Sequence, residues 1–155
     1  MSNKEWQPLI LDVVDDIPYR QIRQLYYPDE TIQKVSEISD LSATHISKVE
    51  RHVSSNHMST AINLLRTFGL GLAIYEDNKF LTADLDLYKL IEKEEVDLKL
   101  LIEDMGYSNS YFLNKDTPLS YTTDNYRDIL DYLGYQLAII QKDSQWKMTG
   151  KDYYL

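Results

Sequence analysis

The sequence predicts a mainly α-helical protein with short β-hairpins, built from two tandem units of four or five helices that are each followed by a hairpin. Three observations predict this fold. Apolar residues recur at helical spacing over most of the chain, alternating apolar runs follow two of the glycines, and the pattern repeats once. Hydrophobic residues make up 43% of the 155 residues, which is enough to bury a core.

The repeat is clearest around two glycines that lie 65 residues apart. The stretch LLRTFGLGLAI at 64–74 matches ILDYLGYQLAI at 129–139 in its apolar positions, its glycine and its Leu-Ala-Ile run. Upstream, residues 35–50 match 101–116 at an offset of 66. Few residues are identical, so the match is one of spacing, and it predicts the same order of elements in both copies.

Capping residues divide the first copy into four helices. Ile22 belongs to the first helix, and Thr31 is expected to cap the second. Ser42 opens the third helix, and Ser59 or Thr60 is expected to cap the fourth. Helical spacing of apolar residues continues between these caps, so each segment predicts one buried face.

A hairpin is expected after the fourth helix. Gly69 stands where a left-handed helix end is wanted. Residues 70–76 then alternate in apolar character, which predicts a half-buried strand. Asp77 and Asn78 offer the turn, and residues 79–82 form the return strand.

The second copy predicts the same plan with different caps. Ser108 and Asp124 are expected to cap its last two helices, and Gly134 to end the final one. A hairpin is expected around residues 143–144, with Trp146 on its return strand.

These patterns divide the chain into an N-terminal segment, 1–16, a first unit, 17–82, and a second unit, 83–155. No glycine- or proline-rich linker separates the units, so they are expected to pack closely. The N-terminal segment carries an apolar stripe in an acidic stretch, and we expect it to form a helix that docks on its own domain or on a partner. The stripe consists of Trp6, Leu9, Ile10, Val13 and Val14.

Charge is distributed unevenly along the chain. The net charge of −9 argues against nonspecific nucleic-acid binding by the whole surface. Within residues 41–68, however, Lys48, Arg51 and Arg66 face only one acidic residue, Glu50, which gives a local net charge of +2. One small window of an acidic protein is therefore cationic.

The same window contains a recognisable motif. Residues 31–51 have the form T-x3-[apolar]-S-E-x2-D-L-S-x3-I-S-K-V-E-R. This pattern resembles the Cro/phage-repressor (XRE) helix-turn-helix family, over roughly residues 20–70 and, more weakly, over 86–134, so that each unit is helix-turn-helix-like. Three positions depart from the alanine, glycine and glycine usual in that family: Ser36, Asp40 and His52.

The resemblance implies that the third helix enters the major groove. Ala43 or the Thr44 methyl group would contact a thymine methyl group, and Lys48 would donate to guanine. Gln33 would contact a phosphate or brace the helix, whereas Glu50 would bond within the domain. The implied DNA-binding residues are Gln33, Ser42, Ala43, Thr44, His45, Ser47, Lys48, Arg51, Ser55 and Asn56. For each of them the alternative is a solvated helix face.

The second copy lacks residues of this kind for DNA binding. Its counterpart of the third helix, 108–116, carries the bulky Tyr111 and Phe112 among acidic residues, which repel phosphate. Dimerisation or binding of another protein is therefore expected of residues 83–155. Late tyrosines favour such a role, with ordinary packing as the alternative: Tyr121, Tyr126, Tyr132, Tyr135, Tyr153 and Tyr154.

Together these features predict a sequence-specific DNA-binding transcriptional regulator, a cytoplasmic homodimeric repressor that reads a double-stranded operator with residues 42–51. The alternative is a protein-interaction module, such as an antitoxin or an acidic inhibitor of a nucleic-acid-binding protein.

Enzymatic, metal and membrane roles are not expected. The chain has no cysteine, no glycine-rich phosphate loop and no HExxH motif, so neither catalytic residues nor a cofactor is predicted. The spacing of His45, His52 and His57 fits no standard metal site. No apolar run reaches the roughly 18–20 residues of a membrane-spanning helix.

Overall fold

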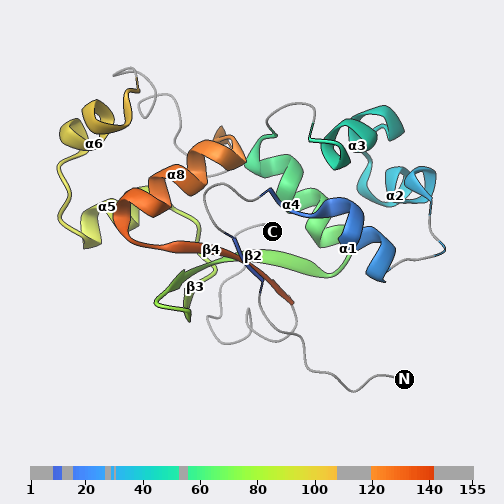
Figure 1. Ribbon diagram of the computed structural model, residues 1–155, viewed down its shortest axis with the longest axis horizontal. Helices are drawn as coiled ribbons and strands as arrows, with labels where there is room; N and C mark the ends of the chain where they lie inside the picture. Colours follow the sequence, from blue (N-terminus) through green and yellow to red (C-terminus); the bar gives the residue numbers. More distant parts are fainter. Residues whose placement is uncertain are drawn as a thin grey trace.

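The computed structural model describes residues 9–11, 16–26, 29, 31–52, 56–107 and 120–141. In this part of the chain, seven helices lie along one face of a four-stranded antiparallel sheet (Figure 1). The fold is therefore mixed α and β. The predicted combination of helices with β-strands is confirmed, whereas the division into two helix-turn-helix units is not. The elements are β1 (Leu9–Leu11), α1 (Tyr19–Tyr26), α2 (Ile32–Ser39), α3 (Ala43–Glu50), α4 (Met58–Thr67), β2 (Leu70–Glu76), β3 (Lys79–Thr82), α5 (Leu87–Lys93), α6 (Leu98–Met105), α8 (Thr123–Leu133) and β4 (Gln136–Gln141).

Two of the predicted helix caps are confirmed. The Thr31 hydroxyl accepts a hydrogen bond from the Lys34 amide at 3.3 Å, and the Ser42 hydroxyl accepts one from the His45 amide at 3.0 Å. Each side chain satisfies a backbone donor that the first turn of its helix leaves unpaired. Gly69 adopts the left-handed conformation expected at the end of α4, with φ of 75°.

Two other predicted caps are wrong. Helix α4 begins after His57 rather than after Ser59 or Thr60, and the cap of α8 is Thr122 rather than Asp124. Thr122 caps α8 locally, since its hydroxyl accepts a hydrogen bond from the Asn125 amide at 3.2 Å. The start of α4 coincides with a tertiary contact, because His57 forms an antiparallel bridge with Thr122. Local capping patterns contain no information about that bridge. The predicted cap at Ser108 lies outside the described residues.

The sheet joins the two halves of the chain. Its order is β1-β4-β2-β3, so the two central strands come from different units. The hairpin of β2 and β3 around residues 77–78 is confirmed. Strand β2 is not half-buried as predicted, since every residue from Leu70 to Tyr75 is buried. A central strand is covered on both faces. On the face that lies away from the main core, Ala73 and Tyr75 of β2 belong to a second, smaller cluster of buried residues with Ala138 of β4.

The N-terminal stripe is not helical where the structure describes it. Residues 9–11 form the edge strand β1, and Leu9 pairs with Ile139 of β4. The segment docks on its own chain through main-chain pairing. Trp6, Val13 and Val14 lie outside the described residues, as does the hairpin expected around residues 143–144 with Trp146.

One core serves both predicted units. A single cluster of buried side chains contains Leu65 and Ile74 from the first unit and Tyr126 and Ile129 from the second, all without measurable exposure. None of the helices in the described ranges is long and apolar enough to cross a membrane.

Two buried tyrosines should respond oppositely to loss of the hydroxyl group. The Tyr19 hydroxyl is buried and has no hydrogen-bond partner among the described residues, whereas the Tyr126 hydroxyl donates to the Leu85 carbonyl at 2.6 Å. Burial raises the pKa of Tyr19, which is therefore neutral at ordinary pH.

We expect Tyr19→Phe to raise the free energy of unfolding by up to about 1 kcal/mol, because it removes a desolvated polar group. Tyr126→Phe should lower it by about 1–3 kcal/mol, because the buried Leu85 carbonyl loses its donor. Urea denaturation followed by circular dichroism measures both, and equal losses in the two variants would contradict the hydrogen-bond assignments.

Candidate nucleic-acid interface

Helices α2 and α3 are joined by a turn of three residues, 40–42. The turn begins at Asp40, which adopts a left-handed conformation with φ of 64°. Its amide donates to the Ser36 carbonyl at 2.9 Å. Asp is one of the few residues other than glycine that visits this conformation at modest cost, so the chain tolerates the departure from the glycine of the XRE pattern.

Two serine hydroxyls of α2 form hydrogen bonds with the backbone of this turn. Ser36 Oγ donates to the Leu41 carbonyl, and Ser39 Oγ accepts from the Leu41 amide at 3.3 Å. Asn63 Nδ2, on α4, donates to the Ser39 carbonyl at 2.9 Å. These bonds give a structural reason for serine where the family pattern has alanine at position 36. Neither Ser39 nor Asn63 stands out by spacing, so the sequence pattern did not indicate them.

The inner face of α3 is fixed by packing and by one ion pair. Ile46 and Val49 are buried in the core. Arg23 of α1 donates to Glu50 through Nε to Oε2 at 2.7 Å and through Nη2 to Oε1 at 3.0 Å. Both side chains are largely buried, with exposed fractions of 15% and 6%. The hydrogen bond to Glu50 raises the pKa of Arg23 above its usual value. Glu50 therefore bonds within the fold, as expected.

The outer face of α3 gathers most of the predicted contact residues. Ser42, Thr44, His45, Lys48 and Arg51 are exposed there, and Ala43 and Ser47 are half-buried beside them. Gln33 is exposed in the first turn of α2. The residues of α3 and its cap therefore form one polar face, and Gln33 is exposed on the neighbouring helix. Asn56 lies apart from them, at the start of α4, and Ser55 is outside the described residues.

The basic residues on this surface differ in their contacts. Lys48 is exposed and forms no ion pair with any residue of the described ranges. Arg51 donates from Nε to the Ser47 carbonyl at 3.3 Å, which keeps its stem along the end of α3. His52 lies 3.6 Å from an Asp16 oxygen and adopts a positive φ of 54°, where the family pattern has glycine. Lys48 is thus the cation most available to a ligand.

The backbone of Asn56 takes part in tertiary hydrogen bonds. Its carbonyl oxygen accepts hydrogen bonds from the Thr123 amide and hydroxyl, both at 2.8 Å. The backbone of Asn56 is therefore part of the junction between the two halves of the chain.

The second half preserves part of the same plan. Helix α6 ends at Gly106 in a left-handed conformation, as α2 ends at Asp40. The predicted counterpart of α3, 108–116, lies outside the described residues.

The late tyrosines mostly pack inside the chain. Tyr121 and Tyr126 are buried edge-to-face, with ring centroids 6.2 Å apart, and Tyr135 is buried with its hydroxyl on Glu94. Tyr132 is 40% exposed and donates to Asp104 at 2.7 Å. Tyr153 and Tyr154 are not described. Ordinary packing therefore accounts for three of the tyrosines singled out, and Tyr132 is left as a surface residue.

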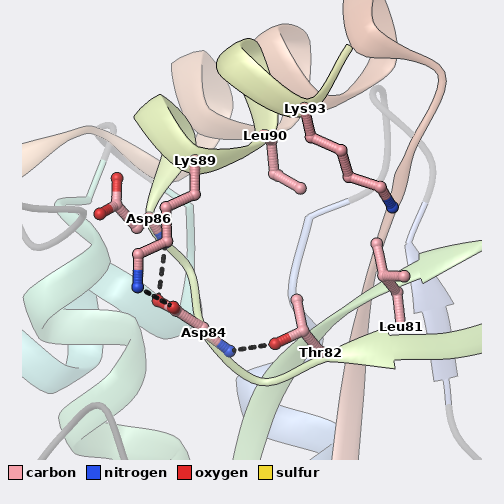
Figure 2. Close-up of a pocket in the computed structure, with 7 residues that line it drawn as sticks. All are labelled: Leu81, Thr82, Asp84, Asp86, Lys89, Leu90 and Lys93. Atoms are coloured by element: carbon pink, nitrogen blue, oxygen red, sulfur yellow. Dashed lines mark hydrogen bonds and ion pairs between the residues drawn. The ribbon is translucent and has the colours of Figure 1, made fainter.

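A shallow hollow of about 230 Å³ lies between β3 and α5 (Figure 2). Two of its charged groups pair with each other, since Lys89 Nζ is 2.8 Å from Asp84 Oδ2. The Asp84 amide donates to Thr82 Oγ1 at 3.0 Å, and Lys93 Nζ lies 5.9 Å from the centroid of the Tyr135 ring. Asp86 in its wall caps α5. Asp84 and Asp86 are therefore both engaged in the turn between β3 and α5. Within the described ranges, no three histidine or acidic residues are grouped to hold a metal ion.

Comparison with known proteins gives no relative, since no family model, curated protein or solved structure matches the chain. The candidate interface therefore depends on the geometry of α2 and α3 described above.

The ion pair that orients α3 should matter for stability. We expect Glu50→Ala to lower the free energy of unfolding by about 3 kcal/mol, because it leaves the Arg23 guanidinium largely buried without its carboxylate. The double variant Arg23→Ala with Glu50→Ala should lose less than the sum of the two single variants. Urea denaturation of all four proteins measures the coupling, and additive losses would show that the pair does not hold α1 to α3.

Proposed function

We propose that this protein is a sequence-specific DNA-binding transcriptional repressor that reads the major groove with residues 42–51. The observation that carries the proposal is the polar outer face of α3, on which small side chains precede an exposed Lys48 while the inner face is fixed in the core. A recognition helix must be held firmly by the protein core and must carry small side chains at the end that enters the groove.

The first turn of α3 suits close approach to base edges. Ser42, Ala43 and Thr44 are short, so the backbone of the helix can enter the groove deeply. Their methyl and hydroxyl groups suit thymine methyl groups and base acceptors, and Lys48, one turn further, suits the acceptors of guanine. Arg51 at the end of the helix suits a phosphate, which positions the protein without reading sequence.

The resemblance of residues 31–51 to the XRE pattern supports the same function. In that pattern the second helix of the pair reads DNA, and here that helix is α3. The short turn at 40–42 and its left-handed Asp40 are compatible with a helix-turn-helix arrangement.

Selection of duplexes from a random pool tests the proposal directly. The bound sequences should converge on a common site, and Lys48→Ala should weaken binding to that site by about tenfold or more, since a base contact is worth about 1–3 kcal/mol. Lys99→Ala removes an exposed lysine from α6 and serves as the matched control, with unchanged affinity expected. A wild-type protein that selects no sequence and shows no salt-sensitive binding would exclude this function.

Arg51→Ala should act differently from Lys48→Ala. Loss of a phosphate contact weakens binding to all sequences alike and reduces the slope of log K against log salt concentration by about one. Titrations at several salt concentrations measure this slope. A change of sequence preference in Arg51→Ala, with the slope retained, would assign Arg51 to the bases instead.

The acidic surface of the second half favours a second candidate function, the binding of a basic protein partner. Burial and the neighbouring Asp124 raise the pKa of Asp128, so the carboxylates of α8 already repel one another. Further exposed acidic residues of this half are Glu92, Glu94, Glu95, Asp97, Glu103, Asp104 and Asp131. A cationic partner would relieve this repulsion.

Charge reversal separates the two functions. The double substitution Glu103→Lys with Asp104→Lys should abolish capture of a basic partner and leave the affinity for selected DNA unchanged or higher. Loss of DNA binding in this variant, with capture retained, would contradict the assignment of the two functions to opposite halves.

A further inference from the structure

The central strands pair as the two halves of a symmetric dimer would. Ala73 of β2 lies opposite Ala138 of β4, and these residues are equivalent in the sequence repeat. The flanking pairs obey the same relation. Leu72 pairs with Ile139. The equivalent of Leu72 in the second copy is Leu137, the equivalent of Ile139 in the first copy is Ile74, and these two residues also form a pair. The ladder is therefore symmetric about the two alanines.

The helix starts repeat this symmetry at a second place. His57 and Thr122 are equivalent in the repeat, and they form an antiparallel bridge with each other. The Met58 amide donates to the Tyr121 carbonyl at 2.7 Å, and its counterpart, the Thr123 amide, donates to the Asn56 carbonyl at 2.8 Å. Two reciprocal hydrogen bonds thus join the first turns of α4 and α8.

The boundaries of the elements agree with this relation. Helix α4 begins at residue 58 and α8 at residue 123, and the left-handed Gly69 and Gly134 follow them at the same offset of 65. Helix α6 spans 98–105, which is the span of α2 moved by 66. The repeat predicted from spacing is therefore present in the three-dimensional arrangement of these elements.

Reciprocal contacts of this kind define an isologous interface, in which the same patch of each partner meets its copy. Here both patches belong to one chain, so the surface through which two single units would pair is already buried. The two outer strands are β1 and β3, which are not equivalent in sequence. The internal pairing leaves no second copy of this surface for another molecule.

We propose that each chain is an internal pseudo-dimer that acts on DNA as a monomer, with α3 as its one reading helix and an asymmetric half-site as its ligand. This replaces the homodimer expected from the sequence. The DNA part of the proposal rests on the proposed function. The sequence at 108–116, which is the counterpart of α3 in the repeat, carries Tyr111 and Phe112 rather than short polar residues.

Cysteine cross-linking tests the internal pairing, because the natural chain contains no cysteine. Residues opposite each other in an antiparallel bridge have Cα atoms about 4.5–5.5 Å apart, within the range of about 4.4–6.8 Å that a disulfide needs. After oxidation, His57→Cys with Thr122→Cys should give an intrachain bond, and the product should migrate as one chain on a denaturing gel. His57→Cys alone is the control. Covalent dimers formed by the double variant in preference to the intrachain product would overturn the proposal.

Sedimentation of the unmodified protein gives a second measurement that needs no variant. A single species of about 18.2 kDa is expected over the micromolar range. A stable species of twice that mass would show that the paired surface does not complete the molecule, and it would overturn the monomeric state.

The stoichiometry on DNA completes the test. A duplex with one selected half-site should bind one chain, and an inverted repeat should bind two chains independently, with the same affinity for each half-site. Cooperative binding that requires both half-sites would overturn the asymmetric ligand. If no duplex is selected at all, the proposed function fails, while cross-linking and sedimentation still decide whether the internal pseudo-dimer exists.

Discussion

The pairing of β2 with β4 is the constraint on which the rest of the described structure depends. It places Ala73 against Ala138 at the centre of the sheet and brings the strands of both halves into one ladder. On the face of the sheet that lies away from the main core, Ala73 and Ala138 are both fully buried. Their small side chains allow neighbouring groups to pack closely against the strands. The helices that lead into these two strands, α4 and α8, therefore share one core rather than forming two.

The candidate interface lies at a distance in sequence from this sheet and is connected to it through α4. Asn63 of α4 donates to the last turn of α2, and Leu64 and Leu65 of the same helix are buried in the shared core. The pose of α2 and α3 is therefore tied to the centre of the molecule. A rigidly mounted helix loses little conformational entropy on binding, which favours recognition of a stiff ligand such as duplex DNA.

Local sequence signals predicted the elements that local physics determines. The caps Thr31 and Ser42, the left-handed Gly69 and the β2–β3 hairpin are confirmed because each depends on neighbouring residues. The errors arose where a distant segment decides. The N-terminal stripe pairs as a strand with β4, α4 begins at His57 where the chain is bridged to Thr122, and β2 is buried on both sides.

The position of Asn56 illustrates the same limit for the candidate site, since its backbone is committed to Thr123, 67 residues away. Having both halves on one polypeptide also changes how the surface can evolve. In an assembly of identical chains every substitution acts twice, so a change that suits one side is imposed on the other. Here Lys48 and the region around Tyr111 are encoded separately, and one side can acquire a new role while the other keeps its chemistry.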